Sequence, residues 1–417
     1  MEKIVAVLGL GYVGFPLVEL LVKSKKYHVI GLDISPDKVK QSASILKAAN
    51  FEASTDFAKL KEADISVVCV PTPTYKNFDP DYRPVKNACL SIAKNLKKGH
   101  LVIIESTINP GTCEEVVLPV LEKFGAVPGK DFCLAHCPER IDPGNKKWTL
   151  SNIPRNVGGL TKECTARAAQ FYRSFLDGEV KEMSNLKIAE ATKIIENTFR
   201  DINIAYVNEL AMSFDAMGID ILEVIEGAKT KPFAFMPHYP GVGVGGHCIA
   251  QDPYYLIDRA LKSGFVHHFL KMARHINNNM PDYTVGLLEK ELKKLGLSLG
   301  KVSVGILGLA YKKNVGDMRE SPAVKVLQIL KAKRAKVFAF DPFVPKEKFP
   351  KLPLTSTAEE LLKKCEVIIL ATAHDDFAKI TPEVLKRSGV KLVIDGRNCL
   401  PKDKILSLGI AYKGIGH

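Results

Sequence analysis

One cysteine lies in a segment that could carry covalent chemistry. Cys248 follows Gly241-Val242-Gly243-Val244-Gly245-Gly246-His247, and Asp252 comes four residues after it. The four glycines remove side chains from the approach to the thiol, so a bulky ligand could lie against the backbone there. A cysteine that only fills a core needs no such setting. The segment therefore predicts a thiol nucleophile.

A second chemical signature opens the chain. Gly9-Leu10-Gly11-Tyr12-Val13-Gly14 is a Gly-x-Gly-x-x-Gly motif that follows an apolar run, and Asp33 ends the next apolar run. Such glycines allow a tight turn and a close approach of pyrophosphate to a helix N-terminus, while the acid can accept from ribose hydroxyls. An acid at this position also repels a 2′-phosphate. The motif predicts NAD rather than NADP, and Cys248 then faces a nicotinamide.

Lys193 and Asn197 form a third candidate pair. They are four residues apart in a helical pattern, so their side chains share one helix face. Because Glu190 and Glu196 are nearby, a solvated charged face is the alternative interpretation.

A cysteine hydrolase that pairs Cys248 with His247 is a further alternative for the thiol. Adjacent residues on an extended chain point to opposite sides, and a hydrolase needs no dinucleotide domain. The sequence disfavours it on both grounds.

The elements that must position these residues fall into three segments. In the first, strand-like apolar runs at 3–8, 28–33, 65–70 and 101–104 alternate with helix-length stretches, which is typical of a doubly wound parallel sheet. From about 185 to 294 the apolar spacing is helical.

After Gly300 the first pattern returns, with Val302–Tyr311 repeating Ile4–Tyr12 and Val337–Asp341 repeating Val29–Asp33. Further strands are expected at 367–371 and 392–395. We predict an α/β fold of two Rossmann-like doubly wound parallel-sheet domains, residues 1–186 and 297–417, joined by a central helical domain, residues 187–296.

The second copy of the glycine turn is degraded. Gly308 is followed by Leu309-Ala310-Tyr311-Lys312-Lys313, so the glycine triplet is lost and lysines are gained. Two interpretations remain open: a sheet retained for a different nucleotide, with Lys312 reaching a phosphate, or a purely structural duplication.

Composition limits the partners. The 417 residues are 46% hydrophobic and 25% charged with a net charge of +13, and the lysines are scattered in short groups along helical stretches. We interpret this as a solvated Lys-rich surface and expect acidic small ligands, but no nucleic acid.

The nine cysteines occur singly without a Cys-x-x-Cys pair, which predicts reduced thiols in a cytoplasmic protein and no metal site. The apolar stretch 4–22 contains Gly9, Gly11, Gly14, Pro16 and Glu19. We therefore predict a strand, a turn and a helix there, and neither a signal peptide nor a membrane span.

Six ordered motifs resemble the UDP-glucose/GDP-mannose dehydrogenase family over essentially the whole chain. They are Gly9–Gly14, Glu105–Thr107 with Pro110–Thr112, Pro138–Arg140, Lys193 with Asn197, Gly245–Cys248 with Asp252-Pro253, and Asp317–Pro322. Members of this family oxidise the C6 alcohol of a nucleotide sugar to a carboxylate with two NAD⁺. The resemblance implies that Cys248 forms a thiohemiacetal with the C6 aldehyde, whose oxidation gives a thioester that water hydrolyses.

The resemblance also implies roles for other side chains. Lys193 would stabilise oxyanions with help from Asn197 and Thr107, Asp252 would position water or act as a base, and Glu139 would serve in hydrolysis or substrate contact. The implied cofactor contacts are Gly9, Gly11, Tyr12, Val13, Gly14, Asp33, Thr72, Thr107 and Arg319. The implied substrate contacts are Glu139, Arg140, Lys193, Asn197, Arg200, Gly245, Lys312 and Arg397.

Arg140 narrows the choice of sugar substrate within the family, because glucose-specific relatives carry an apolar residue at this position. The pattern of residues 196–203 favours the same choice. The chain thus resembles the branch that acts on 2-acetamido sugars, with UDP-N-acetylglucosamine favoured. UDP-N-acetylmannosamine is the alternative substrate, and UDP-glucose is less favoured. Gln251 departs from the apolar residue that relatives usually carry at this position.

The family implies a homodimer or larger assembly through the central helices, and a product used for polysaccharide or glycan synthesis.

Two other classes remain as rivals. A non-catalytic nucleotide-binding regulator could use the same scaffold, but it would have no use for Cys248. A two-electron 3-hydroxyacid dehydrogenase would need neither this cysteine nor the second α/β domain.

Overall fold

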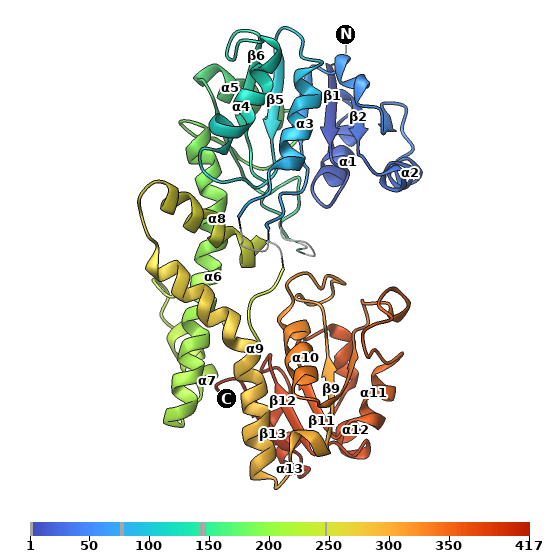
Figure 1. Cartoon of the computed structure of the whole chain (residues 1–417), viewed down its shortest axis with the longest axis vertical. Coiled ribbons are helices and arrows are strands. Elements are labelled where there is room, and N and C mark those ends of the chain that lie inside the picture. The colour runs from blue at the N-terminus through green and yellow to red at the C-terminus, as the bar shows by residue number, and fades with distance from the viewer. Residues whose placement is uncertain (1–2, 76–78, 142–144, 146, 247) are drawn as a thin grey trace. The chain divides into compact units, whose positions relative to one another are not determined.

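The computed structural model describes residues 3–75, 79–141, 145, 147–246 and 248–417 (Figure 1). It divides into two units by internal contacts. Unit 1 comprises Met1–Glu196 with Tyr254–Val266, and unit 2 comprises Asn197–Pro253 with His267–His417.

Unit 1 is built on an eight-stranded sheet of order β3-β2-β1-β4-β5-β6-β7-β8. Its strands are β1 (Lys3–Leu8), β2 (Tyr27–Leu32), β3 (Phe51–Ser54), β4 (Ile65–Val68), β5 (His100–Ile104), β6 (Phe132–His136), β7 (Arg155–Gly159) and β8 (Val180–Glu182). The strand order reverses between β1 and β4, which is where open α/β sheets bind ligands.

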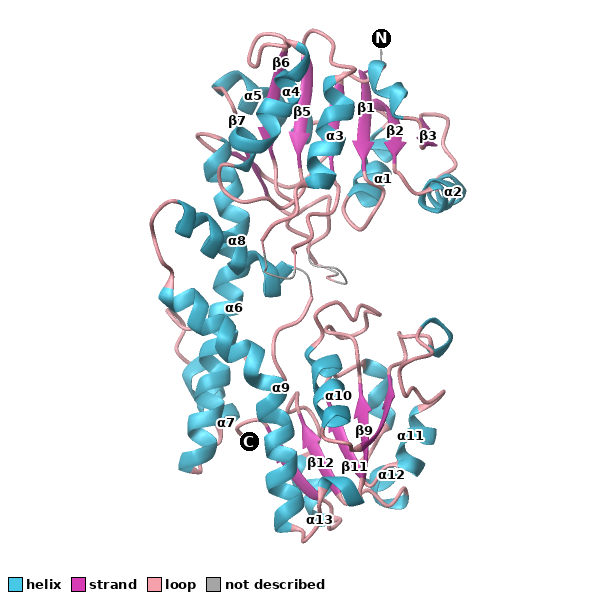
Figure 2. Cartoon of the chain, in the orientation of Figure 1, coloured by secondary structure: helices cyan, strands magenta, loops and turns pink. Residues whose placement is uncertain are grey.

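Helices cover both faces of this sheet, as the secondary-structure view shows (Figure 2). They are α1 (Gly14–Ser24), α2 (Pro36–Ile45), α3 (Arg83–Ala93), α4 (Leu118–Leu121) and α5 (Lys162–Arg173). Val5 and Val7 of β1 belong to the core that contains α1 and α5 side chains, whereas Ala6 and Leu8 belong to the core with α3 and α4. This alternation is why β1 is apolar throughout.

One pairing departs from the predicted all-parallel sheet. β6 and β7 pair antiparallel, whereas the other strand pairs are parallel. A parallel pair needs a crossover, usually a helix. The described part of residues 137–154 contains no helix, so the chain enters β7 from the opposite end.

The central region is helical, as predicted. It contains α6 (Leu186–Met217), α7 (Ile221–Lys229), α8 (Cys248–Lys262) and α9 (His268–Lys294), and the boundary between the units falls within α6 and within α8. In unit 2 a buried polar network joins α6 to α9: Arg274 binds Asp201 at 2.5 Å, and Asn277 donates to the same carboxylate at 2.8 Å.

Unit 2 carries a second, five-stranded parallel sheet of order β10-β9-β11-β12-β13. The strands are β9 (Ser303–Leu307), β10 (Lys336–Phe340), β11 (Val367–Leu370), β12 (Leu392–Asp395) and β13 (Ala411–Gly414). Its helices are α10 (Pro322–Ala332), α11 (Ala358–Lys364), α12 (Pro382–Arg387) and α13 (Lys402–Ser407). Side chains of α9 and α10 pack on one face, and those of α11, α12 and α13 on the other.

The internal repeat is visible in backbone detail. The Gly9 N–H donates to Leu32 at 2.7 Å, and the Gly308 N–H donates to Phe340 at 2.8 Å. Both glycines have positive φ, +98° and +83°. The prediction of two related Rossmann-like sheets is confirmed. No helix among the described residues is long and apolar enough to cross a membrane.

Candidate active site

The turn after β1 shows why three glycines are needed. A Cβ at Gly9 would lie 2.6 Å from the Cys69 carbonyl oxygen, and one at Gly14 would overlap the Gly9 carbonyl oxygen. Gly11 differs, because the nearest described atom to a Cβ there is Lys38 Nζ at 4.0 Å. Gly9 and Gly14 thus satisfy packing within the turn, whereas Gly11 leaves open space above the backbone.

Asp33 is 6% exposed at the carboxyl end of β2. Its Oδ2 accepts the Leu10 N–H at 2.8 Å and its Oδ1 accepts the Ser35 N–H at 2.9 Å. These bonds tie the acid to the glycine turn and leave further lone pairs for ribose hydroxyls.

Lys38 is a residue that sequence reasoning missed. Its ammonium lies 3.8 Å from Asp33 Oδ2, beside the open space at Gly11. The sequence signal that could have found it is the helix start at Ser35-Pro36. It places Lys38 in the first turn of α2, the helix that follows Asp33.

The residues present fit NAD. No side chain in the described structure caps the N-terminus of α1 at Val13, so first-turn N–H groups remain for a pyrophosphate. Tyr12 is 73% exposed at the rim of the turn.

Gly11 and Gly14 give a matched test of the turn. Gly11→Ala should leave the melting temperature within a few degrees of the parent value but weaken NAD⁺ binding roughly tenfold or more, because the methyl group fills space at the pyrophosphate position. Gly14→Ala should instead lower the melting temperature, since its methyl group meets the backbone. Thermal melts and NAD⁺ titration measure both effects, and equal melting temperatures for the two variants would contradict the assignment.

The loops after β4 and β5 carry the two predicted threonines. Thr72 is buried and its carbonyl accepts the Tyr255 hydroxyl, while Thr107 is half-buried. Between them Ser106 Oγ donates to the Val70 carbonyl at 2.7 Å. Hydrogen bonds thus join the loop after β4 to α8 and to the loop after β5, at the carboxyl edge of the sheet.

A fully buried charged cluster supports this edge. Glu105 accepts the Tyr172 hydroxyl at 2.5 Å and lies 4.0 Å from the Arg155 guanidinium, and both charged side chains are 0% exposed. Burial raises the pKa of the Glu105 carboxyl, and the Arg155 charge opposes that rise. Glu105 belongs to a motif in the sequence, but its partners could not be predicted, because Arg155 and Tyr172 come from β7 and α5.

Glu139 and Arg140 follow β6. Glu139 is 7% exposed and accepts the Ile141 N–H. Arg140 binds Glu196 of α6 at 2.6 Å and donates to the Pro154 carbonyl at 2.9 Å. In this structure the arginine therefore anchors the segment after β6 to α6.

Lys193 and Asn197 lie one turn apart on α6 and are 8% and 7% exposed. The alternative of a solvated charged face is therefore wrong for this pair. The exposed residues of α6 include apolar ones, with Ile195 at 59% and Phe199 at 46%, whereas Glu190 is fully buried and accepts the Cys113 N–H at 2.8 Å.

In unit 2, Cys248 and Asp252 occupy the first two turns of α8. Cys248 is the first residue of the helix and is exposed, so a thiolate there would face the positive end of the helix dipole. Asp252 is 1% exposed and accepts the Asn197 side-chain N–H at 2.6 Å. The structure thus brings Asn197 and Asp252 together; His247, the rejected hydrolase partner, lies outside the described residues.

The glycines before Cys248 have a different role from the one expected. A Cβ at Gly245 would lie 2.7 Å from Pro322 and 2.8 Å from Tyr311, and one at Gly246 would lie 2.7 Å from the Tyr311 ring. The Gly246 N–H also donates to the Arg319 carbonyl at 3.0 Å. Protein atoms of unit 2, rather than a ligand, occupy the space that these glycines leave.

The remaining predicted contacts are in unit 2. Lys312 is half-buried after β9, Arg397 is exposed after β12 with its guanidinium close to Gly241, and Arg319 pairs with Asp317 at 2.6 Å. Arg200 is exposed on α6.

In the degraded turn after β9, Asp341 Oδ2 accepts the N–H groups of Leu309 and Ala310 at 2.7 and 2.8 Å and also contacts His374 at 3.1 Å.

The described residues contain no group of three His, Cys, Asp or Glu side chains that could hold a metal ion. A dinucleotide turn on one Rossmann sheet, a helix-borne cysteine and a second Rossmann-like sheet together define the class of NAD-dependent dehydrogenases with a separate substrate domain.

Family models agree with this class along the chain. The NAD binding domain of the UDP-glucose/GDP-mannose dehydrogenase family matches residues 3–176, its central domain matches 187–279 and its UDP binding domain matches 305–402. The chain belongs to the UDP-glucose/GDP-mannose dehydrogenase family. It is an NAD-dependent nucleotide-sugar dehydrogenase.

Individual relatives cover nearly the whole chain. A UDP-N-acetyl-D-mannosamine dehydrogenase of Pyrococcus horikoshii is 34% identical over 99% of both chains. A UDP-N-acetyl-D-glucosamine 6-dehydrogenase of Pseudomonas aeruginosa is 36% identical over 96% of this chain and 98% of its own.

Solved structures give the same result. The UDP-D-ManNAc dehydrogenase of Pyrococcus horikoshii superposes with a TM-score of 0.89 at 34% identity, covering 99% of both chains. An NDP-N-acetyl-D-galactosaminuronic acid dehydrogenase of Methanosarcina mazei has a TM-score of 0.88 at 31% identity, covering 100% of this chain and 95% of its own.

Proposed function

We propose that the protein oxidises the C6 hydroxymethyl group of a UDP-2-acetamido sugar to the carboxylate in two NAD⁺-dependent steps through a Cys248 thioester. The balanced reaction converts RCH₂OH, two NAD⁺ and water into RCOO⁻, two NADH and three protons. The observation that carries the proposal is a cysteine at a helix N-terminus, with the buried Asp252–Asn197 pair one turn further on.

NAD⁺, when bound, accepts a hydride from C6 in each oxidation. The chain supplies the rest. The Cys248 sulfur adds to the C6 aldehyde and retains it as a thiohemiacetal; after the second oxidation the C–S bond of the thioester breaks during hydrolysis, and the thiolate leaves.

Lys193 and Asn197 stabilise the negative charge that develops on the C6 oxygen, with Thr107 as a further donor. Both are more than nine-tenths buried, so their hydrogen bonds act where water is scarce. Asp252 or Glu139 takes the proton from the hydrolytic water.

The favoured substrate is UDP-N-acetylglucosamine, with UDP-N-acetylmannosamine as the alternative and UDP-glucose behind both. Two kinds of support exist for a 2-acetamido sugar: Arg140, and relatives whose names specify N-acetyl sugars at 31–36% identity. Because those names cover different sugar configurations, they support the acetamido class rather than one epimer.

The number of NADH molecules formed per sugar molecule tests the proposed four-electron oxidation. Limiting UDP-N-acetylglucosamine, UDP-N-acetylmannosamine or UDP-glucose is incubated with excess NAD⁺, and NADH is measured at completion. We expect two NADH per acetamido sugar. One NADH would indicate the two-electron rival, and none from any UDP-sugar would eliminate the proposal.

We propose that the chain forms a homodimer, or a larger homo-oligomer, through an apolar surface of the central helices. Within unit 2, Phe199 and Tyr206 of α6 and Phe269 and Met272 of α9 are about half to two-thirds exposed. Exposed apolar side chains in such numbers indicate an interaction surface.

Charges on this surface should separate the subunits. Phe269→Glu combined with Met272→Glu is expected to give a monomer in analytical ultracentrifugation, whereas Lys293→Glu at the exposed end of α9 keeps the parent mass. A parent protein that sediments as a monomer would refute the dimer.

We place the enzyme in the cytoplasm, where its nine cysteines, all within the described ranges and outside disulfides, remain reduced. Its uronic acid product would supply polysaccharide or glycan synthesis. Detection of the protein in a secreted fraction would contradict this location.

A further inference from the structure

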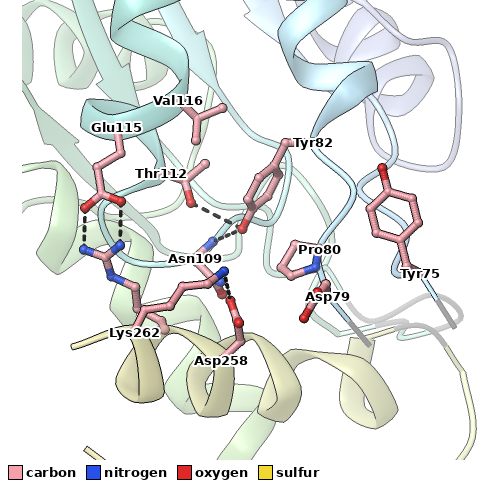
Figure 3. Close-up of a pocket in the computed structure, with 11 residues that line it drawn as sticks. Tyr75, Asp79, Pro80, Tyr82, Asn109, Thr112, Glu115, Val116, Asp258 and Lys262 are labelled. Atoms are coloured by element: carbon pink, nitrogen blue, oxygen red, sulfur yellow. Dashed lines mark hydrogen bonds and ion pairs between the residues drawn. The ribbon is translucent and has the colours of Figure 1, made fainter. Parts of the chain in front are cut away.

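Unit 1 contains a cavity that the proposed reaction does not use. It has a volume of about 330 Å³ and lies between the loops after β4 and β5 and the second half of α8 (Figure 3). Its size is at the lower end of the range for small-molecule sites. Its polar lining residues include Tyr82, Asn109, Glu115, Asp258, Arg259 and Lys262.

Asn109 leaves one acceptor unused at this cavity. Its side chain is 5% exposed, and its Oδ1 has no hydrogen-bond partner among the described residues. Leaving a buried carbonyl without a donor is unfavourable, because its hydration is lost without replacement. A ligand N–H donor in the cavity would remove that cost.

Tyr82 supplies the complementary donor on the same wall. Its hydroxyl oxygen accepts the Asn109 N–H at 3.1 Å and the Thr112 hydroxyl at 3.3 Å, so its own proton remains to be donated (Figure 3). Burial raises the pKa of Tyr82 to about 12, which keeps the phenol protonated at neutral pH. The wall therefore offers one acceptor beside one donor.

The charges of the cavity select against anions. Arg259 is paired with both oxygens of Glu115, and Lys262 binds Asp258 at 2.8 Å. Both lining cations are thus already compensated, and Asp79 adds another carboxylate to the lining. A phosphate or carboxylate would meet no uncompensated positive charge, so the preferred ligand is neutral.

We propose that this cavity is a second, non-catalytic site for a neutral molecule with an amide group, whose N–H donates to Asn109 Oδ1 and whose carbonyl accepts from Tyr82. An acetamido sugar and nicotinamide both have this chemistry. Its described lining includes neither a residue of the glycine turn nor Cys248, and the binding claim does not depend on the identity of the nucleotide sugar.

The position of the cavity indicates an effect on the cofactor. Asn109 is two residues after Thr107, and Tyr255 of α8 holds the Thr72 carbonyl. An occupant would therefore link residues 258–262 of α8 to the loops that carry both predicted cofactor threonines. We expect it to tighten NAD⁺ binding, and by thermodynamic linkage NAD⁺ must tighten amide binding by the same factor.

Calorimetry on the full chain tests the binding claim. With NAD⁺ and UDP saturating, so that the main sites are filled, N-acetylglucosamine and nicotinamide are titrated beside glucose, which lacks the amide, and nicotinate, which is anionic. We expect at least one amide to bind, with its matched control roughly tenfold weaker or undetectable. Absence of binding by both amides, or equal binding by the controls, overturns the proposal.

Asn109→Ala locates the site. It removes the acceptor but keeps the Asn109 backbone bonds to Tyr82 and Thr112, so the loop should fold. We expect a roughly tenfold loss of amide affinity, whereas Asn87→Ala on the exposed face of α3 has no effect. An unchanged affinity in Asn109→Ala would place the amide elsewhere, and an NAD⁺ affinity that ignores the bound amide would remove the effector role. The NADH count is measured without added amide, so either claim can fail alone.

Discussion

Cys248→Ser is expected to lower NADH formation from a UDP-2-acetamido sugar at least roughly a thousandfold. At neutral pH a serine hydroxyl at the first position of α8 remains un-ionised, whereas a thiolate is favoured there by the helix dipole. An oxygen ester is also hydrolysed less readily than a thioester, so any acyl adduct would accumulate. The steady-state rate is the measurement.

A matched control separates this effect from general loss of a thiol. Cys399→Ser changes the other exposed cysteine, in the same unit but outside the predicted site, and it should keep the parent rate. NAD⁺ affinity should be unchanged in both variants, since the glycine turn is untouched. Parent-level turnover by Cys248→Ser would exclude covalent catalysis through this sulfur.

Asp252→Asn should lower kcat by about a hundred- to ten-thousandfold. The replacing amide has nearly the same shape, and its carbonyl can still accept the Asn197 N–H, so folding should be retained. The change removes the buried carboxylate that can accept a proton from the hydrolytic water. It therefore acts mainly on hydrolysis of the thioester.

The readout is the covalent intermediate. Intact-protein mass spectrometry during turnover should show more acyl-enzyme in Asp252→Asn than in the parent, and Asp282→Asn on the exposed surface of α9 should resemble the parent. A slow variant without any accumulated acyl-enzyme would assign Asp252 a role before the thioester.

Some of the architecture could be predicted because its causes are local. The strands around Val5 and Val304 are apolar runs that end in glycine, and Gly9 and Gly308 both adopt the positive φ that the turn requires. The requirement for glycine at position 14 is local as well, since a Cβ there would meet the backbone of its own turn. Strand–helix alternation then leaves few arrangements for the sheets.

Other features depended on distant residues. The apolar spacing predicted a helix here, and Ile194 of α6 is fully buried. Ile195 and Phe199 are nevertheless exposed, and Lys193 and Asn197 are buried. The buried face of α6 thus mixes apolar with polar side chains, and so does its exposed face. Periodicity reports that a helix has two faces, but not which face will be covered.

Sequence alone was enough to predict the dinucleotide turn, the doubled Rossmann-like scaffold and the helical centre, and to single out Cys248 as a candidate nucleophile, because each depends on backbone requirements of neighbouring residues. The folded chain was needed to show that Asp252 binds Asn197, that Glu105 is buried 4.0 Å from Arg155, and that Tyr311 and Pro322 fill the space beside Gly245. Those partners are far apart in the chain, and which of them meet is set by packing of whole helices and sheets, where a buried charge or amide persists only if a partner arrives with it.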